Sequence, residues 1–496
     1  MAIEIILLEQ LPLAEGTNLF DRMTTNPIGP GLLQLEAVLE KEGYKVGLGS
    51  VKDIKDIDKI LTRQPNTGIV GISCITANCQ DAYYALDHIK KNYELPTIIG
   101  GCHVTFLPEE ALNHADVVFV GETEISLPEF LGEVEQKGWP KKKMDRIRGA
   151  IIDDNGVRIN PRYMVKDLDS LPHIKYTYTV VKTTSTPLDG FLAKVSAKAR
   201  LSTSRGCPFA CEFCQSSRKE GMKWRANSAE YVVDSMELFE EKGANMIQFV
   251  DDNFSLDAKR IEKICDLIEK RGLDVSWAFF GRLDWIATHP NLFHRMVENG
   301  CMSIFVGIES GSQKVLDGMK KKLTVDQITK GFEIIHSEKA VFSTGSMIIG
   351  AYDDTEKTID HSIDFVKKLN PHFALFTMMT PYPGAPLYDR LVKENRINTY
   401  DWSKYTGENL VFDHPFIDND LVQYKLYEVY KEYYSREEWQ DKINSWDVPS
   451  DMLPSLPQFI KNWLFRRVIS NVKKKGFKYW SKVLEDYEVE MGRDVS

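Results

Sequence analysis

Short apolar segments alternate with amphipathic helical segments along most of this chain, and that alternation strongly limits the folds open to it. Within residues 1–137 the predicted strands are 3–8, 44–48, 68–73, 96–100 and 117–120, and the predicted helices are 31–42, 81–92 and 124–136. Apolar strands joined through helices favour a parallel sheet that is covered on both faces. We therefore expect an α/β protein whose N-terminal domain is a doubly wound, Rossmann-like parallel sheet.

The same alternation returns six times within residues 201–390. The strands predicted there are 201–204, 246–251, 275–281, 302–308, 342–350 and 373–380, and the helices include 228–242, 256–271, 324–337 and 355–369. Six strand–helix units predict a partial (β/α)6 barrel, with its chemistry at the carboxyl ends of the strands. Residues 138–200 form a connector with a hairpin expected around the Asn155-Gly156 turn. Residues 391–496 form a helical C-terminal domain.

The composition is that of an ordinary globular chain. Of its 496 residues, 43 % are hydrophobic and 27 % are charged, which is enough for a large core. The net charge of −10 argues against general nucleic-acid binding. No run approaches the roughly 18 apolar residues of a membrane span. The apolar start is one strand long and lacks a basic region, so we expect a core strand rather than a signal peptide. We expect a cytoplasmic protein without a transmembrane segment.

Three of the eight cysteines, Cys207, Cys211 and Cys214, lie in one short loop with the sequence CPFACEFC. Three thiolates are one fewer than the four protein ligands of a structural zinc site. They can hold three irons of a [4Fe-4S] cluster and leave the fourth iron open to an exchangeable ligand. The alternatives are that the three cysteines share this loop by chance or that they form part of a zinc site. The other five cysteines lie in apolar or helical contexts, where a buried small side chain is the default.

The spacing C-x3-C-x2-C resembles the signature of the radical S-adenosylmethionine (SAM) superfamily. Phe213 precedes the last cysteine, and Arg205-Gly206 leads into the loop, as in that superfamily. The resemblance implies that the open iron binds SAM and that an electron from the cluster cleaves the sulfur–carbon bond of SAM. It also implies an external one-electron reductant such as ferredoxin or flavodoxin, and a cytoplasm with little oxygen.

The ends of the second and third barrel strands carry candidate SAM contacts. Asp251, Asp252 and Asn253 resemble the segment that contacts the amino group of SAM, and Arg282 can bring a cation to its carboxylate. Each has an alternative. Asp252 and Asn253 can cap the next helix, and Arg282 can pair with Asp284.

Later strand ends continue this pattern. Glu309 and Ser310 resemble the family segment near the ribose and carboxylate of SAM, and Ile348 lies where the family packs the adenine. The proline-rich segment 381–388 (PYPGAPLY) is similar to one that closes the core in a subfamily of these enzymes. A proline-rich loop has a restricted backbone, and we expect Tyr382 to line the substrate cavity.

Small residues gather at the carboxyl ends of the N-terminal strands, where a backbone can approach a bulky ligand closely. The candidate ligand contacts are Ser73, Thr76, Gly100, Gly101, His103, Val104, Thr105, Gly121 and Glu122. The succession G-G-x-H-x-T, P-E-E and V-G-E ahead of a radical SAM core resembles the cobalamin-binding domain of cobalamin-dependent radical SAM enzymes. This resemblance implies that the domain binds cobalamin.

One motif of other cobalamin proteins is missing. The Asp-x-His-x-x-Gly motif, whose histidine ligates cobalt from below, is absent from the loop after the first strand. The resemblance then implies a cobalt without a histidine beneath it. His103 is the alternative ligand, since histidine commonly binds metals. It can equally contact the corrin edge or close its loop.

Together the two cofactors imply a methyltransferase that acts on an unactivated sp3 carbon, through a 5′-deoxyadenosyl radical and methylcobalamin. Three alternatives remain at this stage. One is a cobalamin-dependent cyclase or another carbon–carbon bond-forming enzyme. A tRNA methylthiotransferase is the second, in which Cys74, Cys79 and Cys102 would supply further thiols. The third is a corrinoid-binding protein without catalysis.

The substrate leaves no local motif, because residues scattered over several strands form its cavity. Lipids, tetrapyrroles, natural-product intermediates and protein side chains are all substrates of enzymes with this resemblance. Residues 463–480 are basic and aromatic. They form either a membrane-surface element for a lipid substrate or a helical cap on the barrel.

Overall fold

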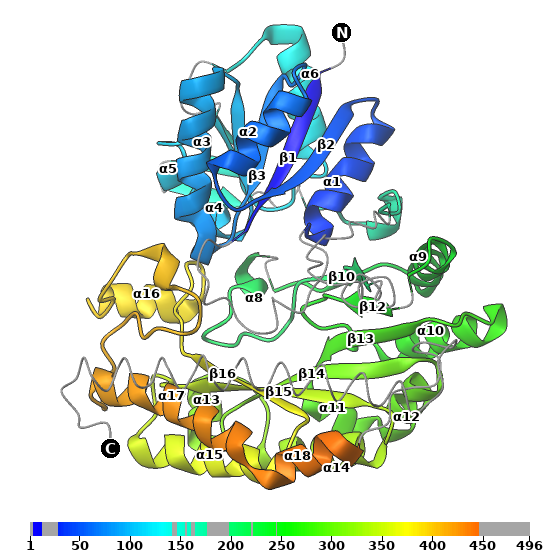
Figure 1. Ribbon diagram of the computed structural model, residues 1–496, viewed down its shortest axis with the longest axis vertical. Coiled ribbons are helices and arrows are strands. Elements are labelled where there is room, and N and C mark those ends of the chain that lie inside the picture. The colour runs from blue at the N-terminus through cyan, green and yellow to red at the C-terminus, as the bar shows by residue number, and fades with distance from the viewer. Residues whose placement is uncertain are drawn as a thin grey trace.

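Two parallel sheets, one above the other in Figure 1, form the frame of the protein. The computed structural model describes residues 3–11, 28–140, 146–153, 156–159, 164–175, 198–219, 222–244 and 246–445. The N-terminal sheet lies at the top of the view and the second sheet at the bottom, with the segment that carries α16 (Pro386–Lys393) between them. This arrangement confirms the expected α/β fold class.

The N-terminal sheet has the strand order β2-β1-β3-β4-β5-β6, and every pairing in it is parallel. Its strands are β1 (Glu4–Gln10), β2 (Lys45–Val51), β3 (Ile69–Ser73), β4 (Thr97–Gly100), β5 (Val117–Phe119) and β6 (Ile147–Arg148). The strand order reverses at β1, so a crevice opens at the carboxyl ends of β1 and β3. The doubly wound sheet is as predicted, and β6 extends it past residue 137, into the segment expected to be a connector.

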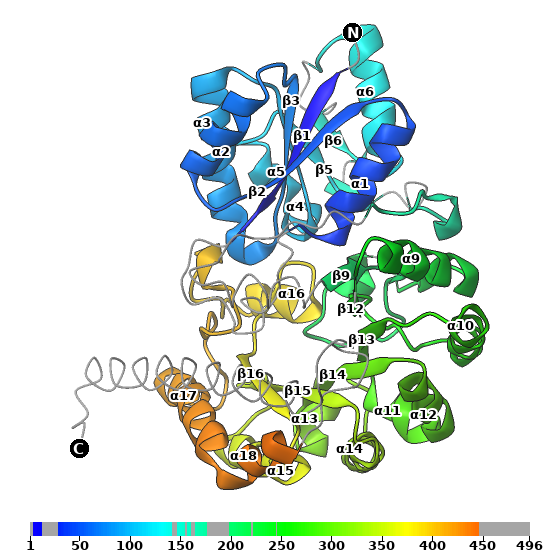
Figure 2. The same cartoon turned by 45° about the vertical axis from the view of Figure 1, so that its right-hand side comes forward.

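Helices cover both faces of this sheet (Figure 2). They are α1 (Pro30–Lys41), α2 (Ile54–Arg63), α3 (Cys79–Tyr93), α4 (Cys102–Phe106), α5 (Pro108–Ala111) and α6 (Ser126–Lys137). The period of two in a strand decides which side chains meet which helices. Ile5 and Leu7 of β1 belong to the apolar cluster with α1 and α6, whereas Ile6 and Leu8 belong to the one with α2 and α3. Both faces of β1 are therefore buried, as its unbroken apolar run predicts.

The second sheet has its six strands in simple chain order, which is the arrangement of an open partial barrel. Its strands are β9 (Lys198–Leu201), β12 (Met246–Phe249), β13 (Ser276–Gly281), β14 (Cys301–Glu309), β15 (Phe342–Ile349) and β16 (Phe373–Met378). Its helices are α8 (Ser216–Lys219), α9 (Ala229–Glu241), α10 (Ala258–Arg271), α11 (Leu283–Thr288), α12 (Pro290–Glu298), α13 (Gln313–Gly318), α14 (Val325–Ser337) and α15 (Glu356–Leu369). A short antiparallel pair, β10 (Ser204–Arg205) and β11 (Arg225–Ala226), follows β9. The six predicted strands are all present.

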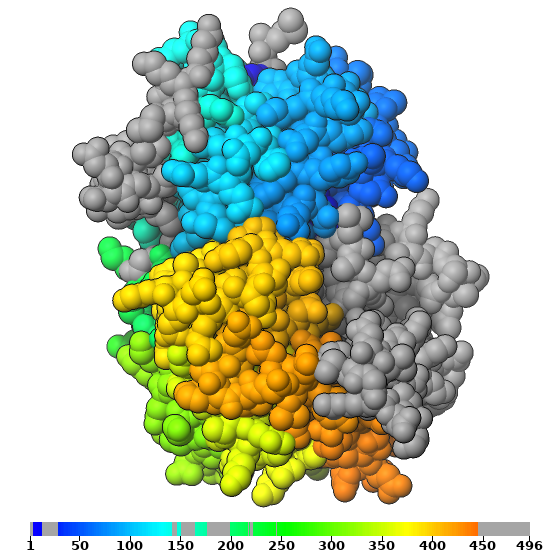
Figure 3. Space-filling model, turned by 90° about the vertical axis from the view of Figure 1, so that its left-hand side faces the viewer, coloured from blue at the N-terminus to red at the C-terminus, as the bar shows by residue number. Residues whose placement is uncertain are grey.

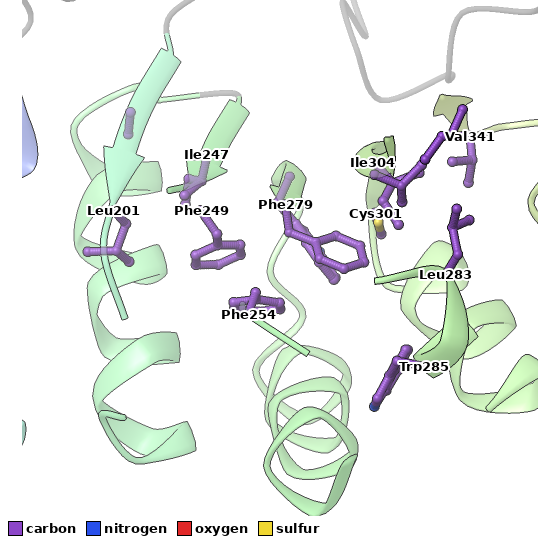
Figure 4. Packing of buried hydrophobic residues seen from close by; sticks show 14 of the residues in the cluster. Leu201, Ile247, Phe249, Phe254, Phe279, Leu283, Trp285, Cys301, Ile304 and Val341 are labelled. Carbon is purple, nitrogen blue, oxygen red and sulfur yellow. The ribbon is translucent and has the colours of Figure 1, made fainter. Parts of the chain in front are cut away.

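Aromatic rings fill the core between the first barrel strands and their helices (Figure 4). Phe254, from the loop after β12, stacks on Phe249 with ring centroids 4.4 Å apart and lies 5.5 Å from the ring of Phe279. All three rings are buried. Offset and tilted aromatic pairs of this kind each add about 0.5–1.5 kcal/mol to the effect of burial. The loop that leaves β12 is thereby held against the barrel, and this loop carries candidate SAM contacts.

The C-terminal helices α17 (Asn419–Ser435) and α18 (Glu437–Ser445) cover the β16 edge of the barrel sheet. On α17, the hydroxyl of Tyr430 accepts a hydrogen bond from the amide of Phe376 (3.1 Å) and donates one to its carbonyl (2.7 Å). Tyr434, four residues on, does the same for Ala374 (3.3 and 2.7 Å). An open sheet edge would leave these backbone groups unpaired. The two tyrosines therefore close the edge.

Two further sequence predictions have different outcomes. The hairpin is present as the antiparallel pair β7 (Ala150–Asp153) and β8 (Gly156–Ile159), although the turn residues 154–155 lie outside the described residues. The basic and aromatic segment 463–480 also lies outside the described residues. Among the helices that are described, none is both long enough and apolar enough to cross a membrane.

Candidate active site

A cavity of about 390 Å³ lies where the N-terminal sheet faces the first strands of the barrel. From the N-terminal domain it is lined by the carboxyl ends of β1, β3 and β4, the loop after β5 and the start of α1. From the barrel it is lined by residues 201–202 and 204–206, together with Tyr231, Val250 and Asp252. The crevice predicted from the strand order and the start of the cysteine loop therefore open into one space.

Five of the predicted ligand contacts line this cavity, namely Ser73, Gly100, Gly101, Gly121 and Glu122. Gly101 has φ +115°, and a Cβ at this position would overlap the carbonyl oxygen of Cys74. Only glycine combines this backbone conformation with so close an approach. The loop after β4 consequently lies directly against the loop after β3, and both present backbone to the cavity.

The other predicted contacts of the N-terminal domain lie one layer behind the cavity wall. Thr105 donates a hydrogen bond to the carbonyl of Gly101 (2.8 Å) and accepts one from the amide of Gly121 (3.0 Å), so it joins two loops that line the cavity. Val104 lies in the apolar core, and Thr76 lies within 3.4 Å of a ring nitrogen of buried His103. A direct cofactor contact by any of these four residues stays a prediction.

Glu9, a residue that sequence reasoning missed, also lines the cavity at the end of β1. Its carboxylate accepts a hydrogen bond from the amide of Gly29 (3.4 Å). Burial raises the pKa of Glu9 to about 7, against the opposing effects of the Gly29 amide and of Arg200. An acidic side chain at the end of an otherwise apolar first strand was the signal in the sequence.

Glu122 and Glu124 bind two arginines of the barrel. Glu122 contacts Arg205 (Nη1–Oε1 3.2 Å) and accepts hydrogen bonds from Arg225, while Glu124 pairs with Arg205 (2.6 Å). The amide of Val165 also donates to Glu122 (2.6 Å). Burial would raise the pKa of Glu122, but the Arg225 hydrogen bond and the charges of Arg205 and Arg225 lower it to about 2. Glu122 is therefore ionised at neutral pH.

The two arginines lie opposite each other in the β10–β11 pair. Like charges placed directly across a ladder repel each other, and the carboxylates of Glu122 and Glu124 offset that repulsion. Arg205 lies two residues before Cys207. The ion pairs therefore attach the first turn of the cysteine loop to the N-terminal domain.

The cysteine loop is also attached to the barrel. The amide of Glu212 donates to the carbonyl of Met319 (2.9 Å), and the carbonyl of Glu212 accepts from the amide of Leu387 (2.8 Å). Cys211 is buried, and Cys207 and Cys214 are half-buried. Burial raises the pKa of the Cys207 and Cys211 thiols, and the positive charge of nearby Arg282 opposes this effect.

Two cations lie over phenylalanine rings of this loop. The guanidinium of Arg282 lies 3.7 Å from the ring centre of Phe209, and the Lys321 ammonium lies 5.8 Å from that of Phe213. Lys321 in turn binds Glu309 (2.6 Å), whose backbone has φ +62°. A non-glycine residue held in this region costs about 1–3 kcal/mol, which the surrounding contacts must offset. Positive charge beside the thiols favours the thiolate form that iron requires.

Arg282 pairs with Asp284, as the alternative interpretation of this residue predicts. Its guanidinium binds both carboxylate oxygens of Asp284 (3.0 Å each from Nε and Nη2) and donates to the carbonyls of Lys321 and Lys322. Contact between Arg282 and a SAM carboxylate stays a prediction. Lys321, which sequence reasoning did not single out, brings a second cation to the same place, and its distance from the CxxxCxxC motif explains why it was missed.

The three residues after the second barrel strand differ in the hydrogen bonds that they make. Buried Asp251 accepts hydrogen bonds from the amide and hydroxyl of Thr203 (3.0 Å each). Asp252 is exposed toward the cavity and accepts one from Ser216 (2.9 Å). The side-chain amide nitrogen of buried Asn253 has no hydrogen-bond partner among the described protein atoms. A buried polar nitrogen without a partner is costly, so this atom is suited to meet a ligand.

Helix capping does not account for Asp252 and Asn253. The next helix, α10, begins after Asp257, whose carboxylate accepts from the amides of Lys259 and Arg260. The alternative in which Asp252 or Asn253 caps that helix is therefore wrong.

Ser310, Ile348 and Tyr382 are held by contacts within the protein. The Ser310 hydroxyl lies 3.1 Å from that of Ser362, and Ile348 packs in an apolar cluster that Phe213 also joins. Tyr382 packs against the core of the N-terminal domain, and burial raises its pKa to about 12. A Cβ on Gly384, in the same proline-rich loop, would overlap the ring of Phe106. This loop therefore lies against the N-terminal domain, and Figure 3 shows its yellow segment touching the blue one.

Comparisons with known proteins agree with this geometry. The B12 binding domain model matches residues 24–131, and the radical SAM superfamily model matches residues 201–366. The chain is 32 % identical to an uncharacterized methyltransferase, PH0819, of Pyrococcus horikoshii, over 83 % of this chain and 88 % of that one. It is 27 % identical to the bacteriochlorophyllide d C-8(2)-methyltransferase of Chlorobaculum tepidum, over 75 % and 78 %. The chain belongs to the cobalamin-dependent radical SAM methyltransferase family.

Two solved structures share its fold, one of a cobalamin-dependent SAM radical enzyme and one of a radical SAM methyltransferase. OxsB with aqua-cobalamin and SAM bound gives a TM-score of 0.68 at 17 % identity, covering 99 % of this chain and 76 % of that one. TsrM from Kitasatospora setae, with its tryptophan substrate and a SAM analogue, gives a TM-score of 0.61 at 15 % identity, covering 79 % and 76 %. The predicted fold class is thereby confirmed.

The residues of this radical SAM enzyme fit the three cofactors of its family, a [4Fe-4S] cluster, SAM and cobalamin. Three unpaired thiols share one loop beside two cations, which suits the cluster. The Asn253 amide nitrogen suits SAM, because it is buried and has no hydrogen-bond partner within the described ranges. The cavity suits cobalamin, because Gly100, Gly101 and Gly121 present backbone along its wall.

Proposed function

We propose that this enzyme transfers a methyl group from SAM, by way of cobalamin, to an unactivated sp3 carbon of its substrate. The observation that carries this proposal is the single cavity shared by the carboxyl ends of the N-terminal strands and the start of the cysteine loop. When bound, the cluster and SAM supply a 5′-deoxyadenosyl radical that removes a hydrogen atom, and methylcobalamin supplies the methyl group. A shared cavity brings these reactants within reach of one carbon.

The chain's own residues position and shield the reactants. Glu122 and Arg205 hold the N-terminal loops against the cysteine loop. Asp252 and Asn253 orient SAM. The position of Asp252 at the cavity wall supports this role, and so does the buried Asn253 amide nitrogen, which has no hydrogen-bond partner among the described protein atoms. Apolar side chains such as Leu7, Leu127, Leu201 and Val250 line the cavity and exclude water from a reactive radical.

The substrate belongs to one of four classes, a lipid, a tetrapyrrole, a natural-product intermediate or a protein side chain. Two matched relatives methylate bacteriochlorophyllide d, as their names state, and two others are magnesium-protoporphyrin IX monomethyl ester cyclases. We therefore place tetrapyrroles first in a substrate screen. A cytoplasmic location with little oxygen, and a ferredoxin or flavodoxin as electron donor, complete the proposal.

The test uses protein that is purified without oxygen and carries both iron and cobalamin. It is incubated with SAM that bears a deuterated methyl group, a reductant and a panel of candidate substrates. We expect 5′-deoxyadenosine and S-adenosylhomocysteine in equal amounts, and a product heavier by one labelled methyl group. A matched pair of variants, Cys211→Ser and Cys265→Ser, separates the cluster from an unrelated buried cysteine of α10.

Each rival function gives a different product. Loss of hydrogen without gain of the label indicates a cyclase, the activity named for the relative from Rubrivivax gelatinosus, which is 25 % identical. Transfer of a methylthio group to tRNA indicates a methylthiotransferase. Bound cobalamin without formation of 5′-deoxyadenosine, in wild type and Cys211→Ser alike, would leave only a corrinoid-binding protein without radical chemistry.

A further inference from the structure

A second group of metal-ligand side chains lies in the N-terminal domain, behind the cavity wall. The ligand atoms of Cys79, His103 and Glu110 all lie within 4.8 Å of one another. The three residues come from three different helices. Cys79 begins α3, His103 lies in α4 and Glu110 lies in α5. Each ligand is thus carried by a helix rather than by a loop.

The centre of this group lacks a hydrogen-bonding partner. His103 is fully buried, and its Nε2 atom has no hydrogen-bond partner among the described residues. Oε1 of Glu110 is 3.8 Å away, which is too far for a hydrogen bond. The hydroxyl of Tyr83, one turn after Cys79 on α3, is also buried, and it has no hydrogen-bond partner in the part of the chain that the structure describes. Two unsatisfied buried polar atoms at one place would together cost a few kcal/mol, so an occupant is expected.

Neighbouring groups orient the ligands. The other ring nitrogen of His103 lies 3.4 Å from the hydroxyl of Thr76, which leaves Nε2 turned toward Cys79 and Glu110. The indole of Trp402 donates to Glu110 (3.0 Å), and its ring meets the His103 ring edge-on with centroids 5.0 Å apart. Metal ligands are typically held in this way by a second layer of hydrogen bonds.

The donor set selects among metals. A sulfur, an imidazole nitrogen and a carboxylate oxygen are the three ligand types of zinc in proteins. Magnesium and calcium prefer oxygen ligands only, and the thiol therefore argues against them. Cys79 is fully buried, whereas about a third of the Glu110 side chain is exposed. A metal ion can therefore reach the three ligands from the side of Glu110.

We propose that Cys79, His103 and Glu110 bind one zinc ion, with a fourth position open beside Tyr83. On binding, zinc replaces the thiol proton of Cys79, which is released to water, while neutral His103 and ionised Glu110 donate lone pairs. Because Glu110 also binds Trp402, 292 residues further along the chain, the ion reinforces the contact between the N-terminal domain and the segment after α16. The site is structural, and it is separate from the cysteine loop.

The first measurement is made on the wild-type holoenzyme, purified without chelator and without added zinc. Elemental analysis counts zinc against iron and cobalt, and X-ray absorption at the zinc edge reports its ligands without interference from the other metals. We expect about one zinc per chain, with one sulfur and otherwise nitrogen or oxygen ligands. Absence of zinc after growth with zinc supplied, or an environment of oxygen alone, overturns the proposal and leaves a buried water as the occupant.

Variants then assign the ligands. Cys79→Ser and His103→Gln are each expected to lower zinc at least tenfold while leaving iron per chain unchanged, since the cysteine loop is intact. Cys265→Ser, which removes another buried thiol, and His114→Gln, which removes a nearby histidine stacked on Tyr83, are expected to retain zinc. Zinc retained in both ligand variants overturns the assignment. If a variant fails to fold, the ligand count from the wild-type spectrum still decides the question.

Discussion

Glu122 of the N-terminal domain binds Arg205, which lies two residues before the first cysteine of the cluster loop. It binds Arg225 as well, across the short β10–β11 pair. A single carboxylate therefore connects the B12-binding domain with the loop that is predicted to bind the cluster. The contact between the N-terminal domain and the barrel therefore depends on the buried ion pair of Glu122 and Arg205.

Replacing Glu122 by glutamine is expected to weaken that docking. The change removes the carboxylate that both Arg205 and Arg225 contact, and breaking a buried pair on one side costs about 3–5 kcal/mol. We expect a lower thermal midpoint and reduced cobalt per chain, with iron largely retained. Glu133→Gln is the matched control, because Glu133 pairs with Arg148 at the surface, where an ion pair contributes at most about 1 kcal/mol. Equal behaviour of the two variants would contradict the role of Glu122.

Much of this fold could be predicted from the sequence, because a strand that is buried on both faces appears as an unbroken apolar run. All five strands predicted for the N-terminal sheet and all six predicted for the barrel are present. The sixth N-terminal strand, β6, has only two residues and too little pattern to detect. Helix α2 could have been found, since Asp53 caps it and Ile57 and Leu61 are buried at helical spacing.

The candidate site was less predictable, because its decisive contacts join distant parts of the chain. The three cysteines are a local motif, and their spacing alone predicts that they hold the iron–sulfur cluster. In contrast, Glu122 and Arg225 are separated by 103 residues, and Glu110 and Trp402 by 292. No local pattern records such pairs. His103 shows the limit clearly, since its motif points to a cofactor whereas its ring lies behind the cavity wall, next to Cys79 and Glu110.

Glu9 is expected to make the stability of the cofactor-free protein depend on pH. Its pKa is about 7 in the folded protein and 4.5 when exposed, so the folded state holds the proton more tightly. The stability that this group contributes is fully present below pH 4.5 and is lost as the pH rises to about 7. One pKa unit corresponds to ~1.4 kcal/mol, and because Glu9 faces an open cavity we expect a loss on the order of 2 kcal/mol.

Thermal unfolding of cofactor-free protein between pH 4.5 and 8 checks this expectation. Glu9→Gln cannot ionise and should lose less stability over that range than the wild type does. Glu135→Gln, at an exposed position of α6, should follow the wild-type curve. The same pH profile in wild type and Glu9→Gln would show that Arg200 and the Gly29 amide offset the burial of Glu9 completely.

Replacing Cys211 by serine is expected to abolish the cluster. Two thiolates remain, and a cluster held by fewer than three cysteines loses its iron. We expect iron per chain to fall at least tenfold and the formation of 5′-deoxyadenosine from SAM to stop. Cobalamin binding should persist, because Gly100, Gly101 and Gly121 are untouched. Cys265→Ser, in the core of α10, should keep its iron, and loss of iron from both variants would indicate general misfolding instead.

The tyrosine hydroxyls that close the β16 edge are expected to stabilise the barrel. Tyr430→Phe removes the partner of both backbone groups of Phe376 and leaves them buried, which costs about 1–3 kcal/mol. Tyr434→Phe does the same to Ala374. Because each tyrosine serves its own residue, we expect the two losses to add, as thermal or urea unfolding of the single and double variants can show. Tyr84→Phe, at an exposed position of α3, is the control, and a double variant no less stable than this control would mean that water satisfies the β16 edge equally well.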